Sequence, residues 1–190
     1  PEVSLYENPA NVGYARGVNQ GLRLARGRFT MLLGSDTEVR PGTIDRMVRF
    51  LEANPKVGAV APRLIYPDGH EQDSARPFPR PFEMVLRRLV RPNGRKQARV
   101  EFGEKDHQDV DWFVGAMFLM TRECLGKTGG HDPRYYLFMT DVILCRESWN
   151  AGMKVRLLRD AKATHNESRL SRGGLVTLLK KKTGRAHIRD

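Results

Sequence analysis

The chain alternates short apolar runs with segments in which apolar residues recur every three or four positions. The short runs predict β-strands at residues 3–6, 29–33, 57–61 and 155–158, and a longer run predicts a further strand at 110–120. Gly and Pro residues punctuate these runs, as in the turn signal Pro67-Asp68-Gly69. Most of the chain therefore carries the signature of regular structure.

The periodic segments predict helices at residues 13–25, 43–53 and 141–151. The apolar faces of the first two are Ala15, Val18, Leu22 and Ala25, and Ile44, Met47, Val48 and Leu51. Because strands and helices alternate, the sequence predicts an α/β fold with a mostly parallel sheet flanked by helices.

Residues 70–109 depart from this alternation. They contain three Arg-Pro pairs, many charges and little periodicity. We expect a long excursion over the surface with one short helix near 82–90, and long loops of this kind are often functional lids.

The composition sets limits on the class of protein. A length of 190 residues with 39% hydrophobic residues suits one folded domain. We place that domain at 1–168 and a basic tail or helix at 169–190, with an amphipathic pattern at 175–182. No stretch approaches the ~20 apolar residues of a membrane span. Cys124 and Cys145 have no metal-type spacing, so we expect reduced, structural thiols in a cytoplasmic protein.

The formal net charge is +11, from 33 Lys and Arg against 22 Asp and Glu. Such a surface attracts nucleic acid, anionic lipid or phosphorylated substrates. We find no zinc-finger spacing, RNP-type aromatic motif or helix-turn-helix, so nucleic acid is not an expected partner. The basic clusters at 87–99 and 169–189 fit either a solvated face or attraction to the inner face of a membrane.

Asp36 stands directly after the predicted strand 29–33, beyond Gly34 and Ser35. Ligands of open α/β sheets bind beyond the carboxyl ends of strands. A carboxylate there can hold a hard cation, which in turn can neutralise a diphosphate. The alternative is a turn residue or a helix N-cap before Thr43.

Five motifs follow one another in a characteristic order. They are Asn11-Val12-Gly13-Tyr14-Ala15-Arg16-Gly17-Val18-Asn19, the Asp36 strand, Trp112-Phe113-Val114-Gly115-Ala116, Gly129-Gly130-His131-Asp132 with the segment 135–146, and His165. In this order, from about residue 3 to residue 171, the chain resembles the family 2 glycosyltransferases of GT-A fold, and among them the bacterial rhamnosyltransferases. The resemblance implies an inverting transfer from dTDP-rhamnose or a UDP-sugar to a surface-glycan or lipid-linked acceptor, with Mg²⁺ or Mn²⁺.

The resemblance also implies roles for single residues. Asp36 matches the family's metal ligand at the diphosphate, beside Ser35, and His165 matches a histidine that can meet the same metal in related enzymes. The family's usual Asn or Asp two positions before Asp36 is Gly34 here. For His165 a surface or capping role is the alternative.

The catalytic base of the family belongs to a Glu-Asp pair at the start of a helix. Here the pair is Thr140-Asp141, and a further acidic position of the family is Ile143. Asp141 is therefore the candidate base. Its alternative is a helix-start Asp that is favoured by the helix dipole.

Further positions match the family's substrate pockets. Those expected at the nucleotide sugar are Asn11, Gly13, Arg16, Asn19, Ser35 and Asp36. Those expected at the transferred sugar or the acceptor are Trp112, Gly115, Ala116 and Tyr136. Arg169 and Arg172 are candidates to clamp a diphosphate, with a solvated tail as their alternative.

Two expectations concern the chain as a whole. The missing acids at 34, 140 and 143 leave open a non-catalytic GT-A-like binding module. The resemblance further implies a fragment that lacks the N-terminal β-α-β portion, which carries much of the nucleoside pocket. Such a fragment would be inactive alone, and its open sheet edge would favour a homo-oligomer.

Overall fold

The computed structural model describes residues 3–79 and 105–166. Its helices are α1 (Tyr14–Leu24), α2 (Thr43–Ala53), α4 (Arg122–Thr128) and α5 (Thr140–Asn150). The helices predicted at 13–25, 43–53 and 141–151 are thus confirmed to within one residue at each end, and apolar periodicity is clear in the first two. None of the helices in these ranges is long and apolar enough to cross a membrane.

The strands are β1 (Phe29–Leu33), β2 (Thr37–Val39), β3 (Val57–Ile65), β4 (Ala75–Arg76), β5 (His107–Asp109), β6 (Trp112–Phe113), β7 (Met117–Thr121) and β8 (Lys154–His165). The main sheet has the order β1-β7-β3-β8-β2, with β5 also paired to β8, while β4 and β6 form a separate two-stranded sheet.

The direction of the strands corrects one prediction. Between described strands only β3 and β8 pair in parallel, and the other pairs, β1/β7, β3/β7, β2/β8, β5/β8 and β4/β6, are antiparallel. The α/β class with flanking helices is confirmed, but the sheet is mixed rather than mostly parallel. The alternation of strands and helices predicts the order of the elements along the chain, but it does not predict the direction of each strand. Strand β7, which follows the excursion after β3, pairs antiparallel with β3.

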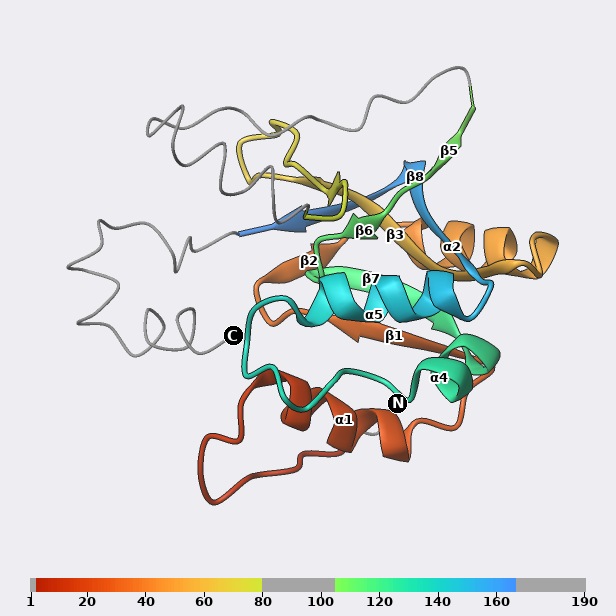
Figure 1. The fold of residues 1–190 in the computed structure, drawn as a ribbon. Helices are drawn as coiled ribbons and strands as arrows, with labels where there is room; N and C mark the ends of the chain where they lie inside the picture. Colours follow the sequence, from red (N-terminus) through yellow and green to blue (C-terminus); the bar gives the residue numbers. More distant parts are fainter. Residues whose placement is uncertain (1–2, 80–104, 167–190) are drawn as a thin grey trace, which may run out of the picture.

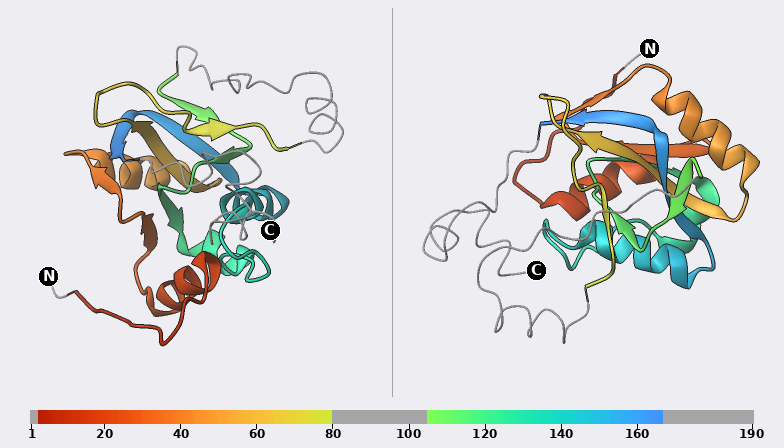
Figure 2. Two further views of the ribbon diagram at one scale, coloured as in Figure 1. Left: turned by 90° about the vertical axis from the view of Figure 1, so that its left-hand side faces the viewer. Right: turned by 90° about the horizontal axis from the view of Figure 1, so that it is seen from above.

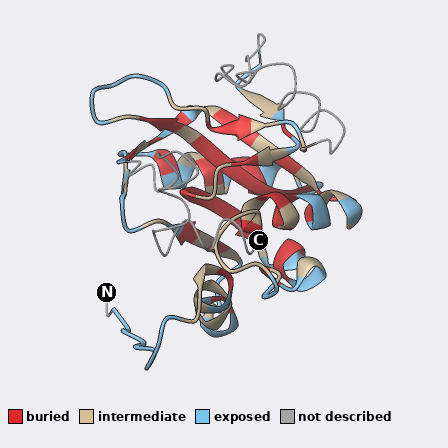
Figure 3. Cartoon of the chain, turned by 60° about the vertical axis from the view of Figure 1, so that its left-hand side comes forward, coloured by how far each residue is buried: buried red, intermediate tan, exposed pale blue. Residues whose placement is uncertain are grey.

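The sheet separates two apolar layers. Helix α2 covers one face, and α1, α4 and α5 lie on the other (Figures 1 and 2). Alternate residues of β7 supply both layers: Phe118 and Met120 pack with Leu144 of α5, whereas Met117 and Leu119 pack with Met47 of α2. Buried residues accordingly concentrate in the central strands (Figure 3).

Three local predictions were wrong. Residues 3–6 form no strand, and Val3 and Leu5 are 91% and 81% exposed, because no described strand lies beside them to complete their hydrogen bonds. The run 110–120 is split into β6 and β7 by a turn at Gly115. In α2 the inward face includes Phe50, while Ile44 is 40% exposed.

Strand β8 is longer than the predicted 155–158. It continues through Arg159, Asp160 and Lys162, whose charges hid it from the sequence pattern, and a register shift opposite Pro62/Arg63 accommodates the extra residues. This extension carries His165 to the edge strand β2, so it positions a candidate ligand.

Several predictions fall outside the described residues. They are the helix at 82–90, the basic helix at 175–182, the tail 169–190, Arg169 and Arg172. Cys124 and Cys145 are both free and buried, and burial raises the pKa of each thiol, as expected of structural cysteines.

Candidate active site

Asp36 and His165 face one another across the edge of the main sheet. Strand β2 pairs antiparallel with β8, in a register that sets Thr37 opposite His165. The Asn166 N–H donates to the Asp36 carbonyl at 2.9 Å, and the side chains approach with His165 Nε2 3.5 Å from Asp36 Oδ2. The structure therefore brings together the two residues that the resemblance assigned to a metal.

Gln72 holds the His165 side of this pair. The chain turns at residues 66–69 and returns beside β3, where the Gln72 N–H donates to the Leu64 carbonyl. From there the Gln72 side chain meets His165 twice, with Oε1 2.9 Å from Nδ1 and Nε2 donating to the His165 carbonyl at 2.6 Å. Sequence reasoning missed Gln72, because an amide in an irregular loop has no periodic signal.

Gly34 leaves room for the Asp36 carboxylate. A Cβ at position 34 would lie 2.8 Å from Asp36 Oδ1 and 3.2 Å from the Ala116 carbonyl. The Gly34 N–H also donates to that Ala116 carbonyl at 2.7 Å. The residue that replaces the family's Asn or Asp therefore permits the observed position of Asp36.

Asp141 lies at the start of α5. Its Oδ2 accepts from the Gly115 N–H at 3.2 Å and its Oδ1 from the Val142 N–H at 2.9 Å. Burial raises the pKa of the Asp141 carboxyl above its usual value, and these two N–H groups oppose the rise. A Cβ on Gly115 would approach the Asp141 Cβ to 3.3 Å. Met139, two residues before Asp141, has a left-handed φ of 63°, and this conformation turns the chain into α5.

Arg76 and Trp112 form a stacked pair beside this carboxylate. They lie opposite one another in the β4/β6 pair, and the Arg76 guanidinium is 5.4 Å from the centre of the Trp112 ring. Arg76 Nε donates to Asp73 Oδ2 at 2.8 Å, and its charge lowers the pKa of Asp141 against the effect of burial. Trp112 was expected at the sugar or acceptor pocket, whereas Arg76 lay in the excursion and was missed.

Helix α1 fixes the loop that leads to Asp141. Asn19 donates to the His131 carbonyl at 2.7 Å and accepts from the His131 N–H at 2.9 Å. Gly13, with a φ of 84°, lies against Tyr136, whose ring a Cβ would meet at 2.6 Å. Asn11 accepts from the Gly13 N–H at 2.9 Å. Asn11, Gly13 and Tyr136 are thus brought together, whereas Asn19 holds His131, and the contacts of all four are made within the protein.

His131 and Tyr14 lie beneath the start of α5. His131 is 2% exposed; its Nδ1 lies 3.2 Å from the Thr140 carbonyl, while its buried Nε2 has no hydrogen-bond partner within residues 3–79 and 105–166. Burial lowers the pKa of the His131 imidazole. The Tyr14 ring packs edge-on against it, and burial together with the nearby Asp141 charge raises the pKa of Tyr14 to about 12.

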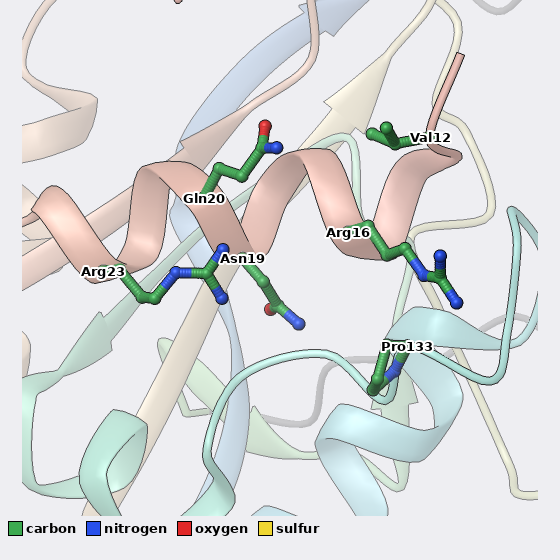
Figure 4. A pocket seen from close by; sticks show the side chains of 6 residues that line it. All are labelled: Val12, Arg16, Asn19, Gln20, Arg23 and Pro133. Carbon is green, nitrogen blue, oxygen red and sulfur yellow. The ribbon is translucent and has the colours of Figure 1, made fainter. Parts of the chain in front are cut away.

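Arg16 lies one turn before Asn19 on helix α1. It lines a hollow of about 300 Å³ between α1 and the loop before α5, together with Val12, Asn19, Gln20, Arg23 and Pro133 (Figure 4). Ser35 is exposed in the turn after β1.

The fold and these motifs define a glycosyltransferase domain of the GT-A-like type. The chain belongs to glycosyl transferase family 2, whose family model matches residues 1–125. It is 27% identical over 187 residues to the N-acetylglucosaminyl-diphospho-decaprenol L-rhamnosyltransferase of two Mycobacterium tuberculosis strains, covering 88% of this chain and 60% of each relative. The chain thus spans about three fifths of the length of these curated relatives.

Two solved structures show the same fold. GalNAc-T7 with UDP, GalNAc and Mn²⁺ matches with a TM-score of 0.61 at 15% identity, over 85% of this chain and 32% of that one. The mannosyltransferase PcManGT from Pyrobaculum calidifontis, in complex with GDP-Man and Mn²⁺, matches with a TM-score of 0.53 at 22% identity, over 88% and 40%. The GT-A-like fold expected from the sequence is therefore confirmed.

Proposed function

We propose that this protein is an inverting glycosyltransferase that moves a sugar from a nucleotide-sugar donor to a lipid-linked or surface-glycan acceptor. One observation carries the proposal: the turn Gly115-Ala116 touches both candidate centres. Ala116 accepts a hydrogen bond from Gly34, over which Asp36 lies, and Gly115 donates to Asp141. A donor held at Asp36 and an acceptor deprotonated at Asp141 would meet over this turn.

The chemistry assigned to Asp141 is that of a general base. Its carboxylate takes the proton of the acceptor hydroxyl as that oxygen bonds to the anomeric carbon, and the bond from this carbon to the diphosphate oxygen breaks. A raised pKa suits the role, because a base works best when its pKa approaches the working pH. Trp112 and Arg76 are assigned to the wall that orients the sugar or the acceptor.

Asp36 and His165 fit a divalent cation, Mg²⁺ or Mn²⁺. They present a carboxylate oxygen and an imidazole nitrogen 3.5 Å apart, which suits two neighbouring ligands of one ion. Within residues 3–79 and 105–166 no third His, Cys, Asp or Glu joins them, so the donor diphosphate and water would supply the other ligands. When bound, such a cation neutralises the charge that develops on the leaving diphosphate.

The choice of substrates is supported by the relatives. The name of the curated relatives specifies a rhamnosyl transfer and a polyprenyl-diphosphate-linked sugar. We therefore place dTDP-rhamnose first among donors, with UDP-sugars next. We also propose a cytoplasmic location at the inner membrane face, supported by the basic charge, and leave self-association as part of the proposal. Nucleic acid has no place in it.

A donor screen tests the proposal. The full-length protein is titrated with dTDP-rhamnose and UDP-sugars, with and without Mn²⁺, by calorimetry. We expect metal-dependent binding that Asp36→Asn abolishes, while Asp160→Asn, an exposed carboxylate of β8, serves as the matched control. Equal binding by Asp36→Asn would remove Asp36 from the site. Binding without turnover, even with an acceptor supplied, would favour the non-catalytic module.

A further inference from the structure

Gln72 contacts His165 at two points, and no sequence motif predicts this contact. One point is the His165 ring, where Nδ1 lies 2.9 Å from Gln72 Oε1, and the other is the His165 backbone carbonyl, 2.6 Å from Gln72 Nε2. Because His165 is only 9% exposed, water has little access to replace either contact.

The contact with the His165 carbonyl determines which atom of the Gln72 amide faces the His165 ring. A carbonyl oxygen can only accept a hydrogen bond, so the nitrogen of the Gln72 amide must face it. The amide oxygen then faces the His165 ring, and an amide oxygen can only accept. His165 Nδ1 must therefore carry the proton, and its neutral ring has its lone pair on Nε2.

That lone pair is directed at the candidate cation position. His165 Nε2 is the ring atom that lies 3.5 Å from Asp36 Oδ2. An imidazole lone pair and a carboxylate oxygen are both acceptors, so the two atoms do not stabilise one another directly. A cation that both ligate would satisfy them together.

We propose that Gln72 is a positioning residue, which fixes His165 in the Nδ1–H tautomer so that Nε2 faces Asp36 as a ligand. The inference rests on the proposed function, because it gives this pair its cation. It adds a residue from the loop after β3 whose side chain contacts the proposed ligand His165. In metal sites such outer contacts set the orientation and basicity of the ligating histidine.

The test begins with the tautomer in the metal-free chain. Long-range ¹H–¹⁵N NMR of ¹⁵N-histidine-labelled protein distinguishes the two tautomers, and the loss of one signal in His165→Ala assigns it among the five histidines. We expect the Nδ1–H form in the parent chain and in Gln72→Glu, which keeps an acceptor at the ring. In Gln72→Leu, of similar size, the Nε2–H form should appear.

The second measurement is Mn²⁺ affinity in the presence of UDP, by water-proton relaxation. Gln72→Leu should weaken it about 10- to 100-fold, the range found for outer contacts of metal ligands. Gln108→Leu is the matched control, because it makes the same change at a half-buried glutamine of β5 that contacts neither Asp36 nor His165. It should leave both readouts as in the parent.

The outcomes separate the two ideas. An unchanged His165 tautomer in folded Gln72→Leu, or equal loss of Mn²⁺ binding in Gln108→Leu, overturns the role of Gln72. The expected tautomer shift in a chain that never binds Mn²⁺ overturns the metal part of the proposed function and leaves the positioning role supported.

Discussion

Asp141 shows how opposing local effects set the pKa of a single carboxylate. Two backbone N–H groups, from Gly115 and Val142, fix its oxygens, and both favour the ionised form. Burial acts the other way and prevails, so the pKa is raised. The helix-start Asp considered from the sequence explains only one of these contacts, because Gly115 comes from a different element.

Replacing this carboxylate is the first prediction. Asp141→Asn should lower turnover by about 100-fold or more, with donor affinity little changed, because the amide cannot accept the acceptor's proton. In the parent enzyme kcat/KM should fall at acid pH with a limb above 3.8, the ordinary value for Asp, since activity needs the ionised form. Full turnover by Asp141→Asn, or a limb at the ordinary value, would place the base elsewhere.

His131 supplies a prediction about stability. The pKa of His131 in the folded chain is below 6.5, because burial disfavours the charged ring. In the unfolded chain the same imidazole has the ordinary pKa of 6.5. The unfolded state therefore binds more protons just below pH 6.5, and the free energy of unfolding should fall as the pH falls there, by at most about 1.4 kcal/mol per pH unit.

In His131→Phe this part of the slope should vanish. Phe keeps a ring against Tyr14 and Phe118 and also removes the unpartnered Nε2. Urea unfolding at pH 7.5 and pH 5.5 measures the slope, with His70→Phe, an exposed histidine, as the control. Identical slopes in the parent and His131→Phe would mean that His131 titrates normally.

The residues of the candidate site divide by the signal they give in sequence. Asp36 follows an apolar strand that the sequence pattern predicts, whereas Asp141 became the candidate base through the family resemblance. His165 came from the resemblance alone, since the charged residues of β8 conceal its strand. Gln72 and Arg76 lie in the segment that follows β3, and no hydrophobic periodicity in the sequence predicts the path of that segment.

At the scale of elements, α1 is joined to the loop before α5 rather than standing apart from it. Asn19 binds both backbone groups of His131, 112 residues further along the chain. The Tyr14 N–H adds a bond to the Tyr136 carbonyl at 2.7 Å. A motif that resembles a nucleotide-binding segment thus also holds the segment that presents Asp141.

Asn19→Ala should consequently destabilise the fold. It leaves the buried N–H and C=O of His131 without their partners, at a cost of about 2 kcal/mol or more. Thermal unfolding measures the loss, and an increase in KM for the acceptor is expected with it. Gln20→Ala is the control on the same helix, since among the described residues the Gln20 side chain bonds only the exposed Asn8 side chain. Equal melting temperatures for the two variants would contradict the clamp.

The helices were predicted better than the sheet for a physical reason. Periodicity records which residues of a helix face the core, and α1 and α2 each have one dominant apolar face. Strand direction is decided instead by the paths between strands, such as the stretch between β3 and β7. The parallel β3/β8 pair is the one part of the expected parallel sheet that the described strands retain.

At the scale of the whole molecule, the dominant feature outside the candidate site is the positive net charge. The chain carries a net +11, and the run Lys180-Lys181-Lys182 adjoins the apolar Leu178 and Leu179. Each basic residue near an anionic surface contributes about 1 kcal/mol, and the attraction decays within about 10 Å at 0.1 M salt. An enzyme with a lipid-linked acceptor would gain from staying at that surface.

The last prediction is therefore that the chain sediments with anionic vesicles, increasingly with anionic lipid content and decreasingly with salt. Replacing Lys180, Lys181 and Lys182 by Glu should reduce the bound fraction more than the same charge change at Arg49, Lys56 and Lys162, which are exposed on the folded domain. Equal reductions would assign the attraction to net charge alone. Equal binding to neutral vesicles would show that the attraction is not electrostatic. DNA and anionic vesicles both attract positive charge, so tighter binding to a random DNA duplex than to anionic vesicles would reverse our choice of partner.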